Sequence, residues 1–200
     1  MGQLGNQLFI IAATISLALD HGAEPLFPDL TTTQRENIPV NREQIFSLIP
    51  LNMNLAPFPL NYCYQEPYFH YAKIPYQPNM KLFGYFQSEK YFIHQKEKIL
   101  QLFSPSKQII DYLESKYDAL IQNPATVAIH YRSYKKEDPN HDVFAACDME
   151  YYLKAISQFP ENSLFIVFSN DIDWCKFHFK TFHVHLFISK TNPIIMTFIL

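Results

Sequence analysis

The second half of the chain alternates short apolar runs with helical patterns, and this alternation constrains the fold more than any other feature. TVAIH at residues 126–130 and LFIVF at residues 164–168 are typical of buried strands. Helices are predicted over residues 148–158 and 171–179, and a further strand over residues 181–188. Strands and helices in alternation predict a parallel sheet with crossover helices, and therefore an α/β fold.

The first half is less regular. A buried apolar helix is predicted over residues 6–21, followed by irregular loops with one or two short elements over residues 25–78. A short strand is predicted over residues 81–86, a helix capped by Ser88 over residues 88–103 and an amphipathic helix over residues 106–121. The dipeptide Asn123-Pro124 ends the last helix. We therefore predict one domain over residues 1–124 and a second over residues 125–200.

Composition excludes several classes of protein. The formal net charge of -3 and the scattered Lys and Arg residues offer no broad field for nucleic acid. The apolar run at residues 8–19 is too short to span a bilayer, and no basic stretch precedes it as in a secretory signal. The chain has 3 cysteines, Cys63, Cys147 and Cys175. Their odd number and the absence of a metal-ligand spacing favour a reducing compartment. A cytoplasmic location is the resulting expectation.

The N-terminus suggests a site for a phosphate-bearing ligand. Gly2 and Gly5 precede the first predicted helix, and Asn6 and Gln7 begin it. Glycines let a backbone approach a ligand closely, and the free N–H groups of a helix N-terminus favour an anion. A strand usually leads into such a turn, but only Met1 precedes it here. The strand therefore comes from elsewhere, or the chain is a fragment.

Two polar clusters follow the predicted strands, at residues 130–136 and 169–173. Ligands of open parallel sheets bind outside the carboxyl ends of the strands. His130 and Arg132 lie two residues apart, so in an extended segment both side chains point the same way. The Arg132 guanidinium suits a diphosphate, with Lys135 and Lys136 as additional charges. The alternative interpretation is a solvated basic loop.

A metal site is a further alternative. Asp171 and Asp173 could hold a divalent ion that bridges a diphosphate, although Asp171 equally suits the first turn of a helix. His183 and His185 have a spacing that allows metal binding on a strand, but no third ligand is evident, and we interpret both as structural.

Four segments, in order, resemble the alpha-1,2-fucosyltransferases of glycosyltransferase family 11. They are GQLGNQLF at the start, GYFQSEKYF at residues 84–92, VAIHYR at residues 127–132 and FSNDIDWC at residues 168–175. The resemblance implies a GT-B-like α/β architecture of two Rossmann-like domains, the second (donor) domain being incomplete in this chain. Relatives also begin with a strand before the glycine turn and continue beyond the last segment. We therefore expect a member that is incomplete at both ends.

The resemblance also implies a reaction: inverting transfer of L-fucose from GDP-fucose to the 2-hydroxyl of a terminal galactose on a glycan acceptor, without metal or other cofactor. The residues that it implies for donor binding, carried over position by position, are Gly5, Asn6, Gln7, His130, Arg132, Ser169, Asn170 and Asp171. Tyr85 and Glu89 lie in a matched segment and are interpreted as structural. Ser133 stands where the family carries a second arginine.

Two functions therefore remain in view: a fucosyltransferase, and a catalytically inactive remnant that binds sugars or a partner at most. No general base is identified, since Glu137, Asp138 and Asp148 are all candidates and Asp148 also suits the N-cap of a helix. Some relatives carry an N-terminal anchor, so peripheral membrane association stays compatible with the sequence.

Overall fold

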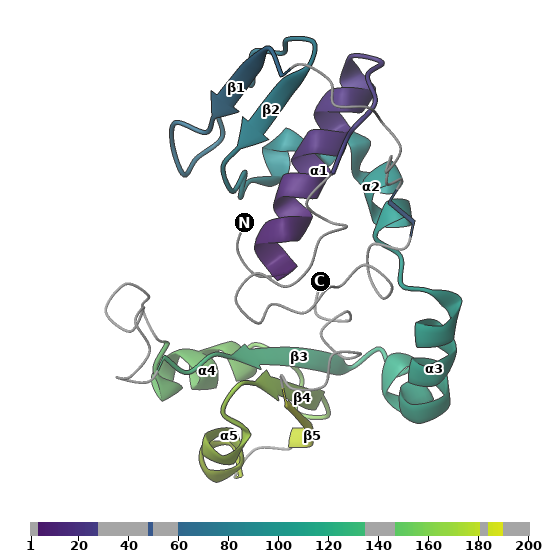
Figure 1. Cartoon of the computed structure of the whole chain (residues 1–200). Coiled ribbons are helices and arrows are strands. Elements are labelled where there is room, and N and C mark those ends of the chain that lie inside the picture. Colours follow the sequence, from purple (N-terminus) through teal and green to yellow (C-terminus); the bar gives the residue numbers. More distant parts are fainter. Residues whose placement is uncertain (1–3, 28–47, 50–59, 135–146, 181–183, 190–200) are drawn as a thin grey trace. The chain divides into compact units, whose positions relative to one another are not determined.

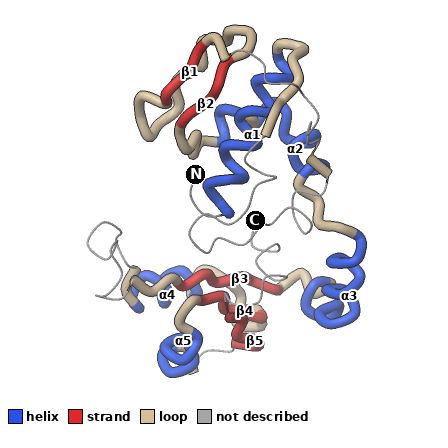
Figure 2. The backbone as a smooth tube through the Cα atoms, viewed as in Figure 1, coloured by secondary structure: helices blue, strands red, loops and turns tan. Residues whose placement is uncertain are grey.

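Two units of mixed helix and strand make up the described chain. The computed structural model describes residues 4–27, 48–49, 60–134, 147–180 and 184–189 (Figures 1 and 2). Contacts divide the chain into Met1–Ser106 and Lys107–Leu200, and each unit is described by itself. Both contain helices and parallel strands, so the predicted α/β class is confirmed. The GT-B arrangement stays a prediction.

In the first unit, a long helix packs against a two-stranded parallel sheet and the segment that follows it. Ala13 of the helix shares a buried cluster with Tyr64, Phe86 and Tyr91. The elements are α1 (Leu4–Asp20), β1 (Tyr62–Gln65), β2 (Met80–Phe83), the 3-10 turns η2 (Glu89–Tyr91) and η3 (Ile93–Gln95), and α2 (Lys96–Leu102). The predicted helix over residues 6–21 and the strand that begins near residue 81 are confirmed, each displaced by one or two residues at its start.

One prediction for this unit is met only in general terms, and one was wrong. β1 lies inside residues 25–78 and is one of the short elements expected among the loops there; its YCYQ sequence has little apolar alternation, and pairing with β2 defines it as a strand. The helix predicted over residues 88–103 is broken into η2, η3 and α2. Phe92 breaks it, with a φ of -145°. At this break, adjacent Tyr91 and Phe92 both pack on the cluster that contains Ala13 of α1.

The second unit contains the parallel sheet that the alternation predicts. β3, β4 and β5 lie in that order, and both neighbouring pairs are parallel. The elements are α3 (Lys107–Ile121), β3 (Thr126–Tyr131), α4 (Met149–Ile156), β4 (Leu164–Ser169), α5 (Ile172–His178) and β5 (Val184–Ser189). Asp148 is the N-cap of α4, as predicted, and its carboxylate accepts a hydrogen bond of 2.9 Å from the Tyr151 N–H.

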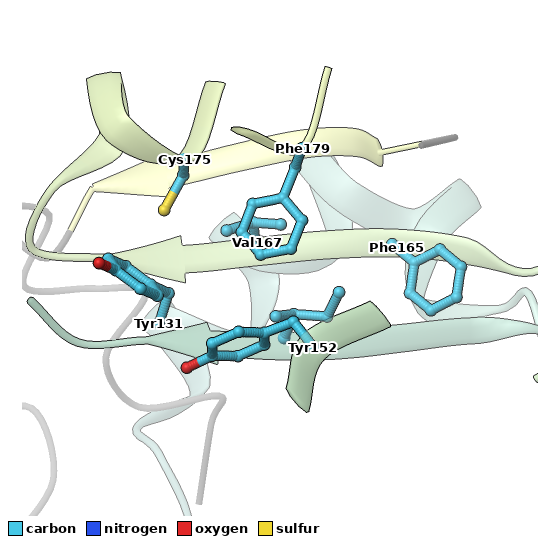
Figure 3. Close-up of a cluster of buried hydrophobic side chains, with 7 residues drawn as sticks. Tyr131, Tyr152, Phe165, Val167, Cys175 and Phe179 are labelled. Carbon is cyan, nitrogen blue, oxygen red and sulfur yellow. The ribbon is translucent and has the colours of Figure 1, made fainter. Parts of the chain in front are cut away.

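The core of this unit lies between the sheet and the helices α4 and α5 (Figure 3). Alternate residues of β3 and β4 point into it, which is the period of a strand. Phe179 and Cys175 are fully buried against Val167 of β4. The whole buried cluster is Ile129, Tyr131, Tyr152, Phe165, Val167, Cys175 and Phe179. Aromatic edges pack against faces within it: the Tyr152 and Phe179 rings lie 5.7 Å apart at 85°.

Helix α3 groups with the second unit, so the division lies between Ser106 and Lys107, whereas the sequence suggests a boundary after Pro124. Backbone and side-chain hydrogen bonds connect α3 to β3 across the short turn. The Thr126 hydroxyl donates to the Leu120 carbonyl at 2.8 Å, and the Thr126 N–H donates to the Asn123 carbonyl at 3.1 Å. The Asn-Pro dipeptide therefore marks a tight turn inside the unit.

Candidate functional site

The carboxyl ends of β3 and β4 lie side by side, with Tyr131 opposite Ser169. Arg132 follows the first strand and Asn170 follows the second. The structure therefore brings together the described parts of the two predicted polar clusters. Lys135 and Lys136 lie outside the described residues, as do Glu137 and Asp138.

A side-chain amide connects the two strand ends. The Asn170 Oδ1 atom accepts a hydrogen bond of 2.9 Å from the Ser133 N–H, and the Asn170 Nδ2 atom donates one of 2.9 Å to the Ser133 carbonyl. Both polar groups of the Asn170 side chain are thus used on one residue of the neighbouring segment.

The turn between β4 and α5 has its own hydrogen bonds. The hydroxyl of buried Ser169 accepts a bond of 2.8 Å from the Asp171 N–H. Asp171 is the N-cap of α5, and its carboxylate accepts a bond of 3.3 Å from the Trp174 N–H. The structure thus supports the helix-cap interpretation of Asp171, and Asp173 lies in the first turn of the same helix. In the described part of the chain, no group of three or more His, Cys, Asp or Glu residues could hold a metal ion.

His130 and Arg132 flank a residue that points into the core. Tyr131 is buried, while His130 is exposed and Arg132 is partly exposed, as the alternation of a strand requires. The Tyr152 hydroxyl donates a hydrogen bond of 3.3 Å to the His130 carbonyl. The Arg132 guanidinium carbon lies 5.1 Å from the centre of the Tyr134 ring, a cation–π contact.

Next to this edge lies an aromatic stack that the sequence analysis did not predict. The rings of Tyr131 and Trp174 are parallel at 4.1 Å, and His178 stacks on the other face of Trp174 at 3.8 Å. Burial raises the pKa of the Tyr131 phenol, although a hydrogen bond with Ser133 opposes this. The signal available in the sequence was Trp174, the 1 tryptophan of the chain, at helical spacing from His178.

The N-terminal residues predicted for the donor lie in the first unit. Gly5, Asn6 and Gln7 form part of the first turns of α1. Gly5 was expected in a turn, but it is helical, and a Cβ added there would meet nothing within 4 Å in the described chain. The Gln87 amide donates a hydrogen bond of 2.6 Å to Asn6 Oδ1, so the first and second family-like segments touch. Gly2 lies outside the described residues.

Glu66, which the sequence analysis did not identify, holds the backbone of the second family-like segment. Its Oε2 atom accepts hydrogen bonds from the N–H groups of Tyr85 at 2.8 Å and Phe86 at 2.9 Å. Phe86 has a φ of 51°, in the left-handed region, and its ring is fully buried. A Cβ on Gly84 would collide with the Cβ of Glu66 and lie 2.7 Å from its Oε2 atom. The backbone N–H of Tyr85 thus has a structural role in this turn, and the interpretation of its side chain as structural stays a prediction.

The comparisons with known proteins agree with this picture. The family model described as Glycosyl transferase family 11 matches residues 60–200. A protein named Alpha-1,2-colitosyltransferase from Escherichia coli is 31% identical over 101 residues, which cover 49% of this chain and 35% of that protein. The match therefore spans about a third of the relative's length. No solved structure matches the chain significantly.

The α/β units and the family match define the class as that of the glycosyltransferases. Within that class, the chain belongs to glycosyl transferase family 11. Proteins of such a family use, in general, a nucleotide-sugar donor and a glycan acceptor. Among the described residues, no helix is long and apolar enough to cross a membrane.

Proposed function

We propose that the protein transfers L-fucose from GDP-fucose to the 2-hydroxyl of a terminal galactose, with inversion at the anomeric carbon. The observation that carries this proposal is the edge formed by Arg132, Ser133 and Asn170, which lies within the residues matched by the family model. The alpha-1,2 linkage in the name of the E. coli relative also supports it.

The chemistry assigned to Arg132 follows from its position beyond β3. A guanidinium binds a diphosphate through paired N–H donors and stabilises the negative charge that grows on GDP as the sugar bond breaks. His130 would border the same pocket, and Ser169, Asn170 and Asp171 would form its other wall. Gly5, Asn6 and Gln7 are proposed to contribute to the same reaction from the first unit. The acceptor hydroxyl would attack in line, on the face opposite the leaving group.

A calorimetric titration with GDP and with GDP-fucose tests the proposal. Removal of the guanidinium in Arg132→Ala should weaken GDP binding by roughly 10–100-fold, because a charge-assisted pair is lost. Lys154→Ala is the matched control: it removes another cation of the second unit, one that pairs with Glu150 at 2.6 Å on the exposed side of α4. The control should bind GDP as the unmodified chain does. Absence of binding by the folded, unmodified chain would reject the proposal in favour of an inactive remnant.

Colitose is a second candidate for the sugar that the donor carries. The name of the E. coli relative specifies colitose, which differs from L-fucose in lacking the hydroxyl at carbon 3. A pocket that hydrogen-bonds this hydroxyl should discriminate strongly against the deoxy sugar, because its polar groups would be left unpaired. Comparison of transfer rates from GDP-fucose and GDP-colitose at equal concentration decides between the two donors.

We also propose that the transfer needs no metal ion. Asp171 already accepts a hydrogen bond as the cap of α5, which supports a structural role for its carboxylate. Transfer should therefore continue unchanged after dialysis against EDTA. Loss of turnover that returns when Mg²⁺ or Mn²⁺ is added would instead support the pair Asp171 and Asp173 as ligands.

A further inference from the structure

The Asn170 side chain makes two hydrogen bonds of opposite sense with a single residue 37 positions away. It accepts from the Ser133 N–H and donates to the Ser133 carbonyl, each at 2.9 Å. A neutral carboxamide carries both an acceptor and a donor, whereas an ionised carboxylate only accepts. Asn170 is therefore chemically matched to both backbone groups of Ser133.

The residues on either side of Asn170 make hydrogen bonds within the turn between β4 and α5. Ser169 is buried at the end of β4 and bonds to the Asp171 N–H at 2.8 Å, while Asp171 caps α5. These bonds fix the backbone from which the Asn170 side chain projects. Ser133 follows the last residue of β3 by two positions; its side chain makes a hydrogen bond with Tyr131, and its backbone N–H and carbonyl bond to Asn170. Asn170 is thus the anchored partner, and the segment after β3 is the one that it holds.

Ser133 lies between Arg132 and Tyr134, whose side chains contact each other. Holding the Ser133 backbone therefore restricts both ends of the cation–π pair. A guanidinium that is ordered before the ligand arrives loses less conformational entropy on binding, which strengthens binding without a new contact. Arg132 is the residue that benefits from this effect.

We infer that Asn170 is a positioning residue: it holds Ser133 so that Arg132 is ordered at the edge of the sheet to bind the diphosphate of the nucleotide. The inference rests on the proposed function for the role of Arg132. It refines the proposed place of Asn170 in the pocket wall: the side chain acts through Ser133 and Arg132 and does not itself contact the nucleotide.

A double-mutant cycle with GDP as the probe tests how Asn170 acts. Asn170→Ala should weaken GDP binding about tenfold, because two hydrogen bonds that order the segment are lost. If Asn170 acts through Arg132, the double variant should bind no more weakly than Arg132→Ala alone. Independent, additive losses would overturn the inference, since they would indicate a direct contact between Asn170 and GDP. An Asn170→Ala variant that binds like the unmodified chain would overturn it as well.

We call the two hydrogen bonds between the Asn170 side chain and the Ser133 backbone the clamp. Hydrogen exchange of the Ser133 amide in the protein without ligand tests this clamp separately from the proposed function. Asn170→Ala should speed this exchange about tenfold, while the amide of Val167 in the core keeps its rate. Asn162→Ala, the same substitution in the exposed turn before β4, is the control and should change neither rate. An unchanged Ser133 rate in Asn170→Ala overturns the inference. Absence of GDP binding by the unmodified chain, with the exchange effect intact, rejects the proposed function and leaves the clamp established.

Discussion

Both units hold the backbone after a strand with one polar side chain, but they do so in different chemical ways. After β2, the Glu66 carboxylate accepts two N–H groups, from Tyr85 and Phe86. After β3, the Asn170 amide accepts one N–H and donates to one carbonyl of Ser133. The Glu66 turn contains a fully buried ring and a left-handed φ, whereas Asn170 is exposed at the edge of a sheet.

Phe86 in the Glu66 turn is buried and Asn170 is exposed, and this difference decides whether a substitution changes stability or ligand binding. At the Glu66 turn Phe86 is buried, so loss of the acceptor leaves the Phe86 N–H without its partner, and the cost appears in the free energy of unfolding. An exposed backbone that loses its clamp is solvated by water, so little stability is lost. We therefore expect substitutions at the Glu66 turn to change stability and substitutions at Asn170 to change ligand binding.

The largest effect is expected for Gly84→Ala. The new Cβ would collide with the Cβ of Glu66, which cannot move away as the end of a flexible side chain would. Displacement of Glu66 would also disturb its bonds to Tyr85 and Phe86. We expect a loss of about 3 kcal/mol in the free energy of unfolding, at the upper end of overpacking effects. Urea denaturation followed by circular dichroism measures it.

Gly5→Ala is the matched control for that experiment. Gly5 lies within α1, and a Cβ there meets nothing within 4 Å in the described chain. Alanine is the better helix former, so this variant should be as stable as the unmodified chain or more stable by up to about 1 kcal/mol. Equal losses in the two glycine variants would contradict the close-contact explanation for Gly84.

The next effect concerns Glu66 itself. Glu66→Ala leaves the N–H groups of Tyr85 and Phe86 without their acceptor, and Phe86 is buried. We expect a loss of about 2 kcal/mol in the free energy of unfolding, as for other hydrogen bonds to charged groups. Asn170→Ala should cost less than about 0.5 kcal/mol, as exposed substitutions usually do. A loss of stability as large for Asn170→Ala as for Glu66→Ala would remove the contrast between the two clamps.

The sequence predicts the second unit well because its elements are encoded locally. The runs TVAIH and LFIVF are apolar enough to define β3 and β4, and Asp148 marks the start of α4. The first unit is less predictable, since its elements depend on distant partners. β1 is defined by its pairing with β2, and the residues at the break, Tyr91 and Phe92, pack on a cluster that includes Ala13 of α1.

In the candidate site, too, the features that depend on local sequence were predictable and those that depend on distant partners were not. Arg132 and Asn170 were predicted to lie at one edge because parallel strands end on the same side of a sheet. The bonds between Asn170 and Ser133 were not predictable, since no local pattern specifies which backbone an exposed amide meets across 37 residues. Glu66 was missed for the same reason, because its partners lie 19 and 20 residues away.

A further effect should appear in alkali, and it compares the cores of the two units. Burial raises the pKa of Tyr152 in the second unit to about 12, and it also raises the pKa of Tyr91 in the first. A phenol whose pKa is higher in the folded than in the unfolded chain stabilises the fold below pH 10. That contribution is lost as the pH rises from 10 towards 12. The second unit should therefore lose stability over this interval.

Tyr152→Phe isolates that contribution, because it keeps the buried ring and removes the ionisable group. The variant also loses the hydrogen bond to the His130 carbonyl, so it should be slightly less stable than the unmodified chain at neutral pH. Between pH 10 and 12 the unmodified chain should lose roughly 1–2 kcal/mol more than the variant. Urea denaturation followed by the fluorescence of Trp174, which lies against this core and is the 1 tryptophan present, reports on the second unit. Parallel pH curves for the two proteins would mean that another group, such as Tyr131, controls the alkaline response of this unit, because burial raises its pKa as well.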